Sequence, residues 1–302
     1  SLTSFLRCQN EWFLNYRIGL RGPLSPHQVM GIEVEDALCS ILMHRCPSIT
    51  SFEQLVEWVI ALVPEHAKSA LNKGRETFEN SMWNSGVFDD HFDEEKIAMM
   101  LTNGINLQLE EVKNCYNSGG GIHEFDVPAP CWENPPHFTQ PHKANSMVVW
   151  KDNPHNFSDQ ITWQDAWEIA RPWMKDPRNP EPQRMYHKDR WASGECDLVL
   201  RWDGRIRIID IKMGDGQGAF ASSLDAQLNF YAWLWNETHD SSCDGLEGWY
   251  LTNGLRKVVE VEPLKTEEYR AIHEKMKSWD CDNSLPIASP CKSDSQRFRW
   301  CC

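Results

Sequence analysis

Apolar side chains recur at helical spacing through the first third of the chain. In the segment after residue 26, for example, Leu38, Ile41 and Leu42 fall on one side of a helix. The same periodicity predicts helices over residues 2–17, 27–45, 51–71 and 93–115. We therefore expect residues 1–121, which end in a run of glycines, to form a helical region that contributes to a larger domain.

The pattern changes after that glycine run. Residues 122–130 alternate as a strand does, and Pro, His, Asn and Trp then crowd an apparent insertion at about 131–190, with one helical stretch at 163–173. Beyond it the pattern predicts two strands around a turn within 195–216, a helix at 222–238, strands at 245–253 and 256–263, and a helix at 266–279. This order predicts an α/β protein with a mixed central β-sheet flanked by helices, residues 122–302 forming the core and a cysteine-bearing tail.

The dipeptide Asp203-Gly204 lies between two alternating apolar runs. It is typical of a two-residue hairpin with a type I′ turn, in which both central residues have positive φ. The register then sets Asp197 opposite Asp210 and Glu195 opposite Lys212 on one side of the sheet. Two carboxylates about 5 Å apart repel unless a cation lies between them or one is protonated, so the hairpin predicts a negative pocket with a lysine beside it.

A structural interpretation of these charges stays open. Glu195 and Lys212 can form an exposed cross-strand ion pair, while Asp197 and Asp210 point to water. The second strand, however, carries isoleucines on both faces, which indicates that it is covered on both sides and that its charges serve a purpose.

The helix predicted at 222–238 adds two polar groups. Gln227 and Tyr231 are four residues apart and share a face with Leu224 and Leu234, so an amide and a phenol project together from the surface that should pack on the sheet. A core tyrosine beside a solvated glutamine is the structural alternative.

Composition narrows the class of protein. The chain has 302 residues, 41% of them hydrophobic, without an apolar run of membrane-spanning length or a signal-peptide pattern at its start, so we expect an intracellular, cytoplasmic protein that does not bind membranes. A formal charge of −14 argues against non-specific coating of nucleic acid, but not against a local basic channel. Eleven scattered cysteines in such a chain favour reduced thiols, some of them metal-bound, over a disulfide framework.

The segments GECD, IIDIKMG and QLNFY together resemble the PD-(D/E)XK nuclease superfamily, in particular its RecB-like branch, which includes the CRISPR-associated iron-sulfur nucleases and the AddB nuclease domains. The resemblance covers about 40 residues and implies a restriction-endonuclease-like core. It implies that Asp197 and Asp210 bind Mg²⁺ or Mn²⁺, that Lys212 positions and activates the attacking water, and that Gln227 and Tyr231 line the site.

The amino-terminal segment carries two further similarities. Cys8 stands where this family has its first cluster cysteine, and the family's G-x-x-x-H motif appears here as Gly31 to Glu35. Glu35 therefore replaces the usual histidine ligand. A carboxylate also suits a hard cation, so Glu35 is a candidate metal ligand, with an exposed surface glutamate as the alternative.

The resemblance implies a 4Fe-4S cluster held by Cys8 and three carboxyl-terminal cysteines. The tail offers Cys291, Cys301 and Cys302, with Cys281 further back, but their spacing differs from the family's C-x2-C-x5-C. Four thiolates suffice for an iron-sulfur cluster or for zinc, and separate thiols remain the alternative.

From these residues we expect a metal-dependent deoxyribonuclease, an exonuclease acting on DNA ends or single strands, with other DNA-processing proteins as partners. The alternative is a non-catalytic or weakly catalytic DNA-binding or scaffold subunit of a DNA repair or CRISPR adaptation complex that keeps the nuclease fold. Glu35 and the acidic surface favour the scaffold, whereas the intact Asp210-x-Lys212 and Gln227-x3-Tyr231 pairs favour the enzyme.

Overall fold

A five-stranded mixed sheet in the order β1-β4-β5-β6-β7 forms the centre of the larger part of the chain. The computed structural model describes residues 2–20, 22–119, 161–174, 184–216, 221–239, 241–263 and 265–281. The strands of this sheet are β1 (Trp173–Met174), β4 (Leu198–Leu200), β5 (Ile206–Lys212), β6 (Cys243–Tyr250) and β7 (Leu255–Val259). Strand β5 pairs in parallel with β6, and the other pairs are antiparallel. The predicted mixed α/β class is confirmed.

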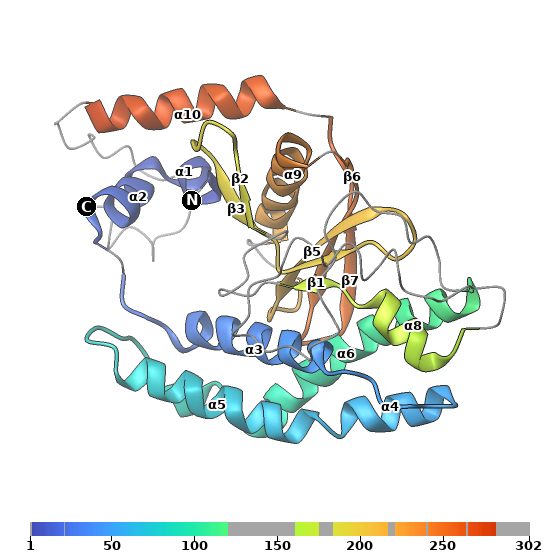
Figure 1. Cartoon of the computed structure of the whole chain (residues 1–302). Helices are drawn as coiled ribbons and strands as arrows, with labels where there is room; N and C mark the ends of the chain where they lie inside the picture. Colours follow the sequence, from blue (N-terminus) through green and yellow to red (C-terminus); the bar gives the residue numbers. More distant parts are fainter. Residues whose placement is uncertain are drawn as a thin grey trace. The chain divides into compact units, whose positions relative to one another are not determined.

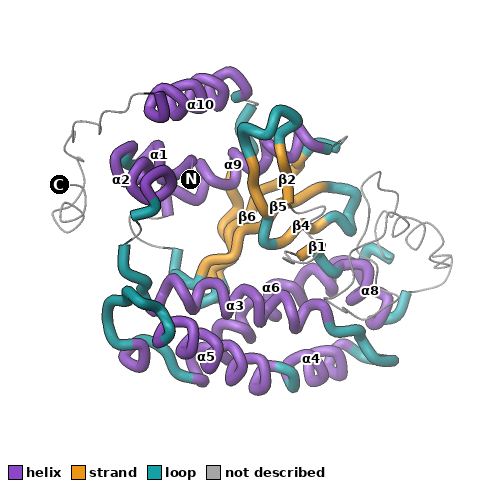
Figure 2. The backbone as a smooth tube through the Cα atoms, turned by 60° about the vertical axis from the view of Figure 1, so that its left-hand side comes forward, coloured by secondary structure: helices purple, strands orange, loops and turns teal. Residues whose placement is uncertain are grey.

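Helices cover both faces of this sheet. Figures 1 and 2 show α9 (Ala221–Thr238) on one side and α3 (Pro26–Met43) with α6 (Glu94–Asn117) on the other. Helix α9 connects β5 to β6, which is the crossover that a parallel strand pair needs. The remaining helices of this layer arrangement are α4 (Phe52–Ile60), α5 (Val63–Glu79), the short 3₁₀ turn η2 (Phe88–Asp90) and α8 (Trp163–Ala170). Because both faces are covered, β5 is buried from Ile206 to Ile211, as predicted.

Two predicted helices end or divide at prolines. The single helix expected over 51–71 is two helices, α4 and α5, because Pro64 in the first turn of α5 has no N–H to continue the ladder of α4. The helix expected over 163–173 ends at Ala170, since the residue before Pro172 leaves the helical region, and Trp173 begins β1. The strand predicted over 122–130 lies outside the described residues. Where it is described, the segment 131–190 contributes α8, β1 and β2 (Arg184–Tyr186).

The hairpin register is as predicted, but its turn is not type I′. Leu198 pairs with Ile209 and Leu200 with Arg207, which is the register inferred from Asp203-Gly204. Gly204 has φ +78°, but Asp203 does not have a positive φ. The carboxylate of Asp203 instead accepts a hydrogen bond from the N–H of Arg205, two residues on, which holds Asp203 in a local side-chain turn.

The predicted pairing of Glu195 with Lys212 is wrong. Glu195 lies in β3 (Ser193–Glu195), which pairs with β2 in a separate two-stranded sheet where Glu195 is opposite Arg184. The chain leaves the ladder at Cys196 and Asp197. There the Asp197 carboxylate accepts the N–H of Ile211 at 2.8 Å, so the ladder donor is satisfied by a side chain and the backbone can turn away.

A buried charged network joins α6 to the sheet. Glu111 of α6 accepts hydrogen bonds from the side chains of Trp202, Arg207 and Arg256, the first at 2.9 Å and the second at 2.6 Å. Arg207 also donates to Glu247 of β6 at 3.2 Å. Glu111, Arg207 and Glu247 are each less than 9% exposed, so this face of the sheet is held by paired charges.

The opposite face brings α9 close to β6. Gly248 lies beside Asp210 in the parallel register, and a Cβ at Gly248 would lie 2.5 Å from Leu224 of α9. The helix approaches this closely because Gly248 has no side chain.

Residues 25–261 form one compact unit, and Ser1–Leu24 with Glu262–Cys302 form a second. In the second unit the helix expected over 2–17 is divided into α1 (Leu2–Arg7), α2 (Gln9–Phe13) and the π-helix η1 (Leu14–Ile18), and α10 (Thr266–Cys281) follows in the carboxyl-terminal part. The division falls at Cys8, whose backbone is extended and whose thiol accepts the N–H of Glu11 as an N-cap. Within the described ranges, no helix is both long and apolar enough to cross a membrane.

Candidate functional site

Asp210 is a buried carboxylate with a partner at each oxygen. It lies in the central strand β5 and is 2% exposed. Gln227 of α9 donates to its Oδ1 at 2.9 Å, and the ammonium of Lys212 contacts its Oδ2. A buried charge requires such pairing. The strand thus brings Lys212 to Asp210, and the helix α9 brings Gln227 to it, as the resemblance implied.

Lys212 lies two residues after Asp210 on the same face of β5, with 38% of its side chain exposed. Burial lowers the pKa of Lys212, but the carboxylates of Asp210, Asp197 and Glu35 together raise it above its ordinary value. The side chain is therefore an ammonium at neutral pH. It can donate to a phosphate or to a water, but it cannot act as a general base.

Asp197 lies at the point where the chain enters the hairpin. Burial raises the pKa of Asp197 well above its usual range, and the negative charges of Glu35 and Asp210 raise it further. Lys212 and the Ile211 N–H oppose this shift without cancelling it. The charge of Asp210 thus acts on Asp197, although the paired register of the hairpin begins only at Leu198.

Glu35 joins the same field from α3. This helix begins with a capping box in which Ser25 and Gln28 satisfy each other's backbone N–H groups, with Pro26 in the first turn. Glu35 follows two turns later and is half-buried. Its carboxylate raises the pKa of both Asp197 and Lys212, so it acts on the site directly and is not a surface glutamate remote from it.

Gln227 links Asp210 to Tyr231. Its Nε2 donates to Asp210 and also to the Tyr231 hydroxyl at 3.1 Å, as their four-residue spacing on α9 allows. Burial raises the pKa of Tyr231, and Asp197 and Asp210 raise it further, so the phenol stays protonated. The ring of Tyr231 packs on Gly194 of β3, where a Cβ would lie 3.0 Å away.

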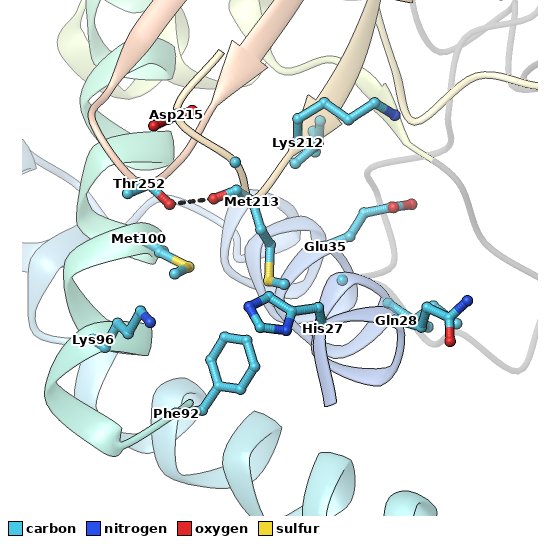
Figure 3. Close-up of a pocket in the computed structure, with 14 residues that line it drawn as sticks. His27, Gln28, Glu35, Phe92, Lys96, Met100, Lys212, Met213, Asp215 and Thr252 are labelled. Carbon is cyan, nitrogen blue, oxygen red and sulfur yellow. Dashed lines mark hydrogen bonds between the residues drawn. The ribbon is translucent and has the colours of Figure 1, made fainter. Parts of the chain in front are cut away.

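A cavity of about 740 Å³ opens beside these residues (Figure 3). It lies between α3, the start of α6 and the carboxyl end of β5, and Glu35 and Lys212 are part of its lining. Figure 3 shows His27, Phe92 and Met213 meeting at its centre, with Lys96 and Met100 coming from α6. No sequence pattern points to His27 or Lys96, because the helices that carry them come together only in the fold.

The donor set fits a hard divalent cation. Asp197, Asp210 and Glu35 offer only carboxylate oxygens, the ligands that Mg²⁺ and Mn²⁺ prefer. Burial raises the pKa of Asp197, the negative charges of Glu35 and Asp210 raise it further, and a bound cation offsets that repulsion. In the part of the chain that the structure describes, no three His, Cys, Asp or Glu side chains already converge as a preformed metal site.

Most of the predicted cluster cysteines lie outside the described residues. Cys291, Cys301 and Cys302 are in the part of the tail that is not described, and so is the side chain of Cys281. Cys8 is buried in the unit formed with α10. The cluster stays a prediction.

No protein-family model and no curated protein matches this chain. The resemblance to PD-(D/E)XK nucleases therefore rests on the sequence segments quoted above and stays a prediction.

Proposed function

We propose that the chain is a divalent-metal-dependent deoxyribonuclease of the PD-(D/E)XK type that hydrolyses phosphodiester bonds at DNA ends or in single strands. One observation carries the proposal: Lys212 and Gln227 hold the buried Asp210 from two sides, and the charges of Asp197 and Glu35 act on Lys212 together with that of Asp210. A purely structural pair of one lysine and one aspartate does not need two further carboxylates beside it.

The chain's own residues have separable roles in this reaction. Asp197 and Asp210, with Glu35, would hold Mg²⁺ or Mn²⁺, which when bound makes water more acidic and offsets phosphate charge. Lys212 donates to the phosphate oxygen that gains charge as water adds to phosphorus and the ester oxygen leaves. Gln227 fixes Asp210 in place through its hydrogen bond, and the neutral Tyr231 fixes the Gln227 amide in turn.

A nuclease assay tests the proposal. Labelled single-stranded and double-stranded DNA are incubated with the full chain in Mg²⁺, in Mn²⁺ or in chelator. We expect cleavage with either metal and none in chelator. DNA that stays intact under all three conditions contradicts the proposal.

A DNA-binding or scaffold subunit with little activity is the second candidate. Glu35 in place of the family's histidine favours it. DNA binding without cleavage in the same assay would identify this case.

The iron-sulfur cluster, the DNA-processing partners and the cytoplasmic location stay proposals. Iron and zinc analysis of anaerobically purified protein tests the cluster. Loss of the metal in Cys8→Ser supports it, and protein free of both metals excludes it.

A further inference from the structure

The cavity beside Lys212 has features that the proposed chemistry does not explain. We propose that it receives one unpaired nucleotide, adjacent to the phosphodiester presented to Lys212, with His27 as the ring that stacks on the base. This inference deepens the proposed function and rests on it. It names the substrate form, a single strand, and the residues that recognise it.

Size and position limit what can enter. A volume of about 740 Å³ lies within the roughly 300–1,000 Å³ typical of sites for small molecules. The lining runs from Glu35 and Lys212 to His27 and Phe92, so an occupant begins at the candidate catalytic groups. One nucleotide is a small molecule of this class, whereas a stacked base pair brings two backbones with it. A duplex must therefore open before it fills the cavity.

The ring of His27 is placed for stacking. It is exposed, and its orientation is held by edge contacts with the rings of His91 at 4.9 Å and Phe92 at 5.1 Å. Although the residue is exposed overall, partial burial of its ring lowers the pKa of His27, and the charges of His91 and Lys96 lower it further, so the ring is a neutral aromatic surface at neutral pH. Figure 3 shows its ring between Phe92 and Met213, directed into the cavity. Aromatic faces of this kind bind bases with little sequence preference.

The charge of the lining also suits a nucleotide. The chain as a whole carries −14, yet the charged lining residues are two lysines, Lys96 and Lys212, and two acids, Glu35 and Asp215. Lys96 is anchored by its bond to the His91 carbonyl at 2.8 Å and lies over the Phe92 ring. The charges of the lining therefore balance on an otherwise acidic protein, so a phosphate meets less repulsion here than the net charge of the chain suggests.

Two glycines in the lining make the proposal testable without removing any contact. A Cβ at Gly31 of α3, or at Gly214 after β5, would meet no atom within 4 Å. A larger side chain at either position therefore extends into open space. At Gly31 it also replaces glycine within a helix, which favours folding.

The experiment measures equilibrium binding of dye-labelled oligonucleotides by the full chain, in chelator so that no cleavage occurs. Gly31→Trp should weaken single-strand binding by about tenfold or more, and Gly31→Ala, which fills little space, by less than about twofold. His27→Ala should weaken binding by roughly 5- to 150-fold, the range for loss of one stacked base. His27→Phe, which keeps a ring, should retain most of the affinity.

The outcomes separate this inference from the proposed function. Equal dissociation constants for wild type and Gly31→Trp, both folded by their melting temperatures, overturn the inference even if wild type cleaves DNA. If Gly31→Trp fails to fold, Gly214→Trp fills the same cavity from the opposite wall and is judged by the same criterion. Tighter wild-type binding to blunt duplex than to single strand also overturns it. If the affinity for single strands falls with the size of the side chain at position 31 and the protein cleaves no DNA, the inference is supported and the nuclease proposal fails.

Discussion

The backbone N–H of Ile211 donates to the carboxylate of Asp197 at 2.8 Å, directly beside the buried Asp210. One hydrogen bond thus places a second acid against the first. It also ends the strand that the sequence pattern extended to Glu195, because the ladder donor no longer needs a backbone partner.

Asp197→Asn tests the repulsion that follows. Asparagine keeps an oxygen that accepts the Ile211 N–H but removes the ionisable carboxyl group. The pKa of that carboxyl is raised by burial and by the charges of Glu35 and Asp210. We expect a higher melting temperature in chelator, although most substitutions lower it. Asp197→Ala, which loses the acceptor as well, should lower the melting temperature. If Asn also lowers it, the carboxylates do not repel one another in the folded protein.

Glu35→Gln tests whether α3 contributes to cation binding. Mg²⁺ should raise the melting temperature of wild type beyond the effect of matched ionic strength, since a ligand of the native state stabilises it. Glu35→Gln should reduce that gain, because one of three carboxylates is lost. Glu33→Gln is the matched control, because Glu33 lies on the same helix but in different surroundings. Burial and Asp36 raise the pKa of Glu33, and Lys73 lowers it. An equal Mg²⁺ response in all three proteins would remove Glu35 from the site.

Lys212→Ala tests catalysis. Loss of a positioned donor to developing negative charge typically costs about 100- to 1,000-fold in rate, and we expect a decrease of that size in DNA cleavage. The melting temperature should also fall, because Asp210 stays buried without its cation. Lys68→Ala, an exposed lysine on α5, serves as the control for loss of surface charge. Cleavage at the wild-type rate by folded Lys212→Ala contradicts the assigned role.

The network around Glu111 predicts a pH dependence of stability. Burial raises the pKa of Glu111, but Arg207, Trp202 and Arg256 together lower it from 4.5 to about 2. A carboxyl group whose pKa is lower in the folded than in the unfolded state stabilises the fold at any pH above its unfolded-state pKa. That contribution is lost as the pH falls toward its folded-state pKa. Stability from Glu111 should therefore decline between about pH 4.5 and pH 2.

Glu111→Gln isolates that contribution. It leaves the buried Arg207 without the charge of this carboxylate, and breaking comparable buried pairs costs about 3–5 kcal/mol. Urea unfolding from pH 7 downward should show a free-energy difference from wild type that is largest near pH 7 and narrows below pH 4.5. A difference that does not change with pH would mean that Glu111 acts through packing alone.

Local signals in the sequence predicted much of the fold and part of the site. Asp203-Gly204 set the hairpin register because a short turn leaves few alternatives, and the four-residue spacing of Gln227 and Tyr231 set their shared face. Pro64 divides one predicted helix and Pro172 ends another, because proline has no N–H to continue the helix. The apolar periodicity, taken alone, extends both helices past these prolines.

The long-range contacts had no such signal. Glu111 meets Arg207 across 96 residues, and Lys96 shares a cavity with Met213 from another part of the chain. A pattern within one helix shows which face is apolar, but it does not show which charged residue of a distant strand will lie against it. The predicted pairing of Glu195 with Lys212 is wrong for a related reason. The Asp197 side chain accepts the Ile211 N–H and ends the strand, and apolar periodicity does not detect such a bond.

Gly248 has a consequence for how variation in this chain would be interpreted. Its missing side chain lets Leu224 of α9 approach β6, and the same helix carries Gln227 to Asp210. A single methyl group at position 248 would act as a spacer between helix and sheet, lengthening the Gln227–Asp210 contact while every polar residue stayed in place. A homologue that keeps all five motif residues would then still have a weaker Gln227–Asp210 contact, and the informative position would be a glycine outside the quoted motifs.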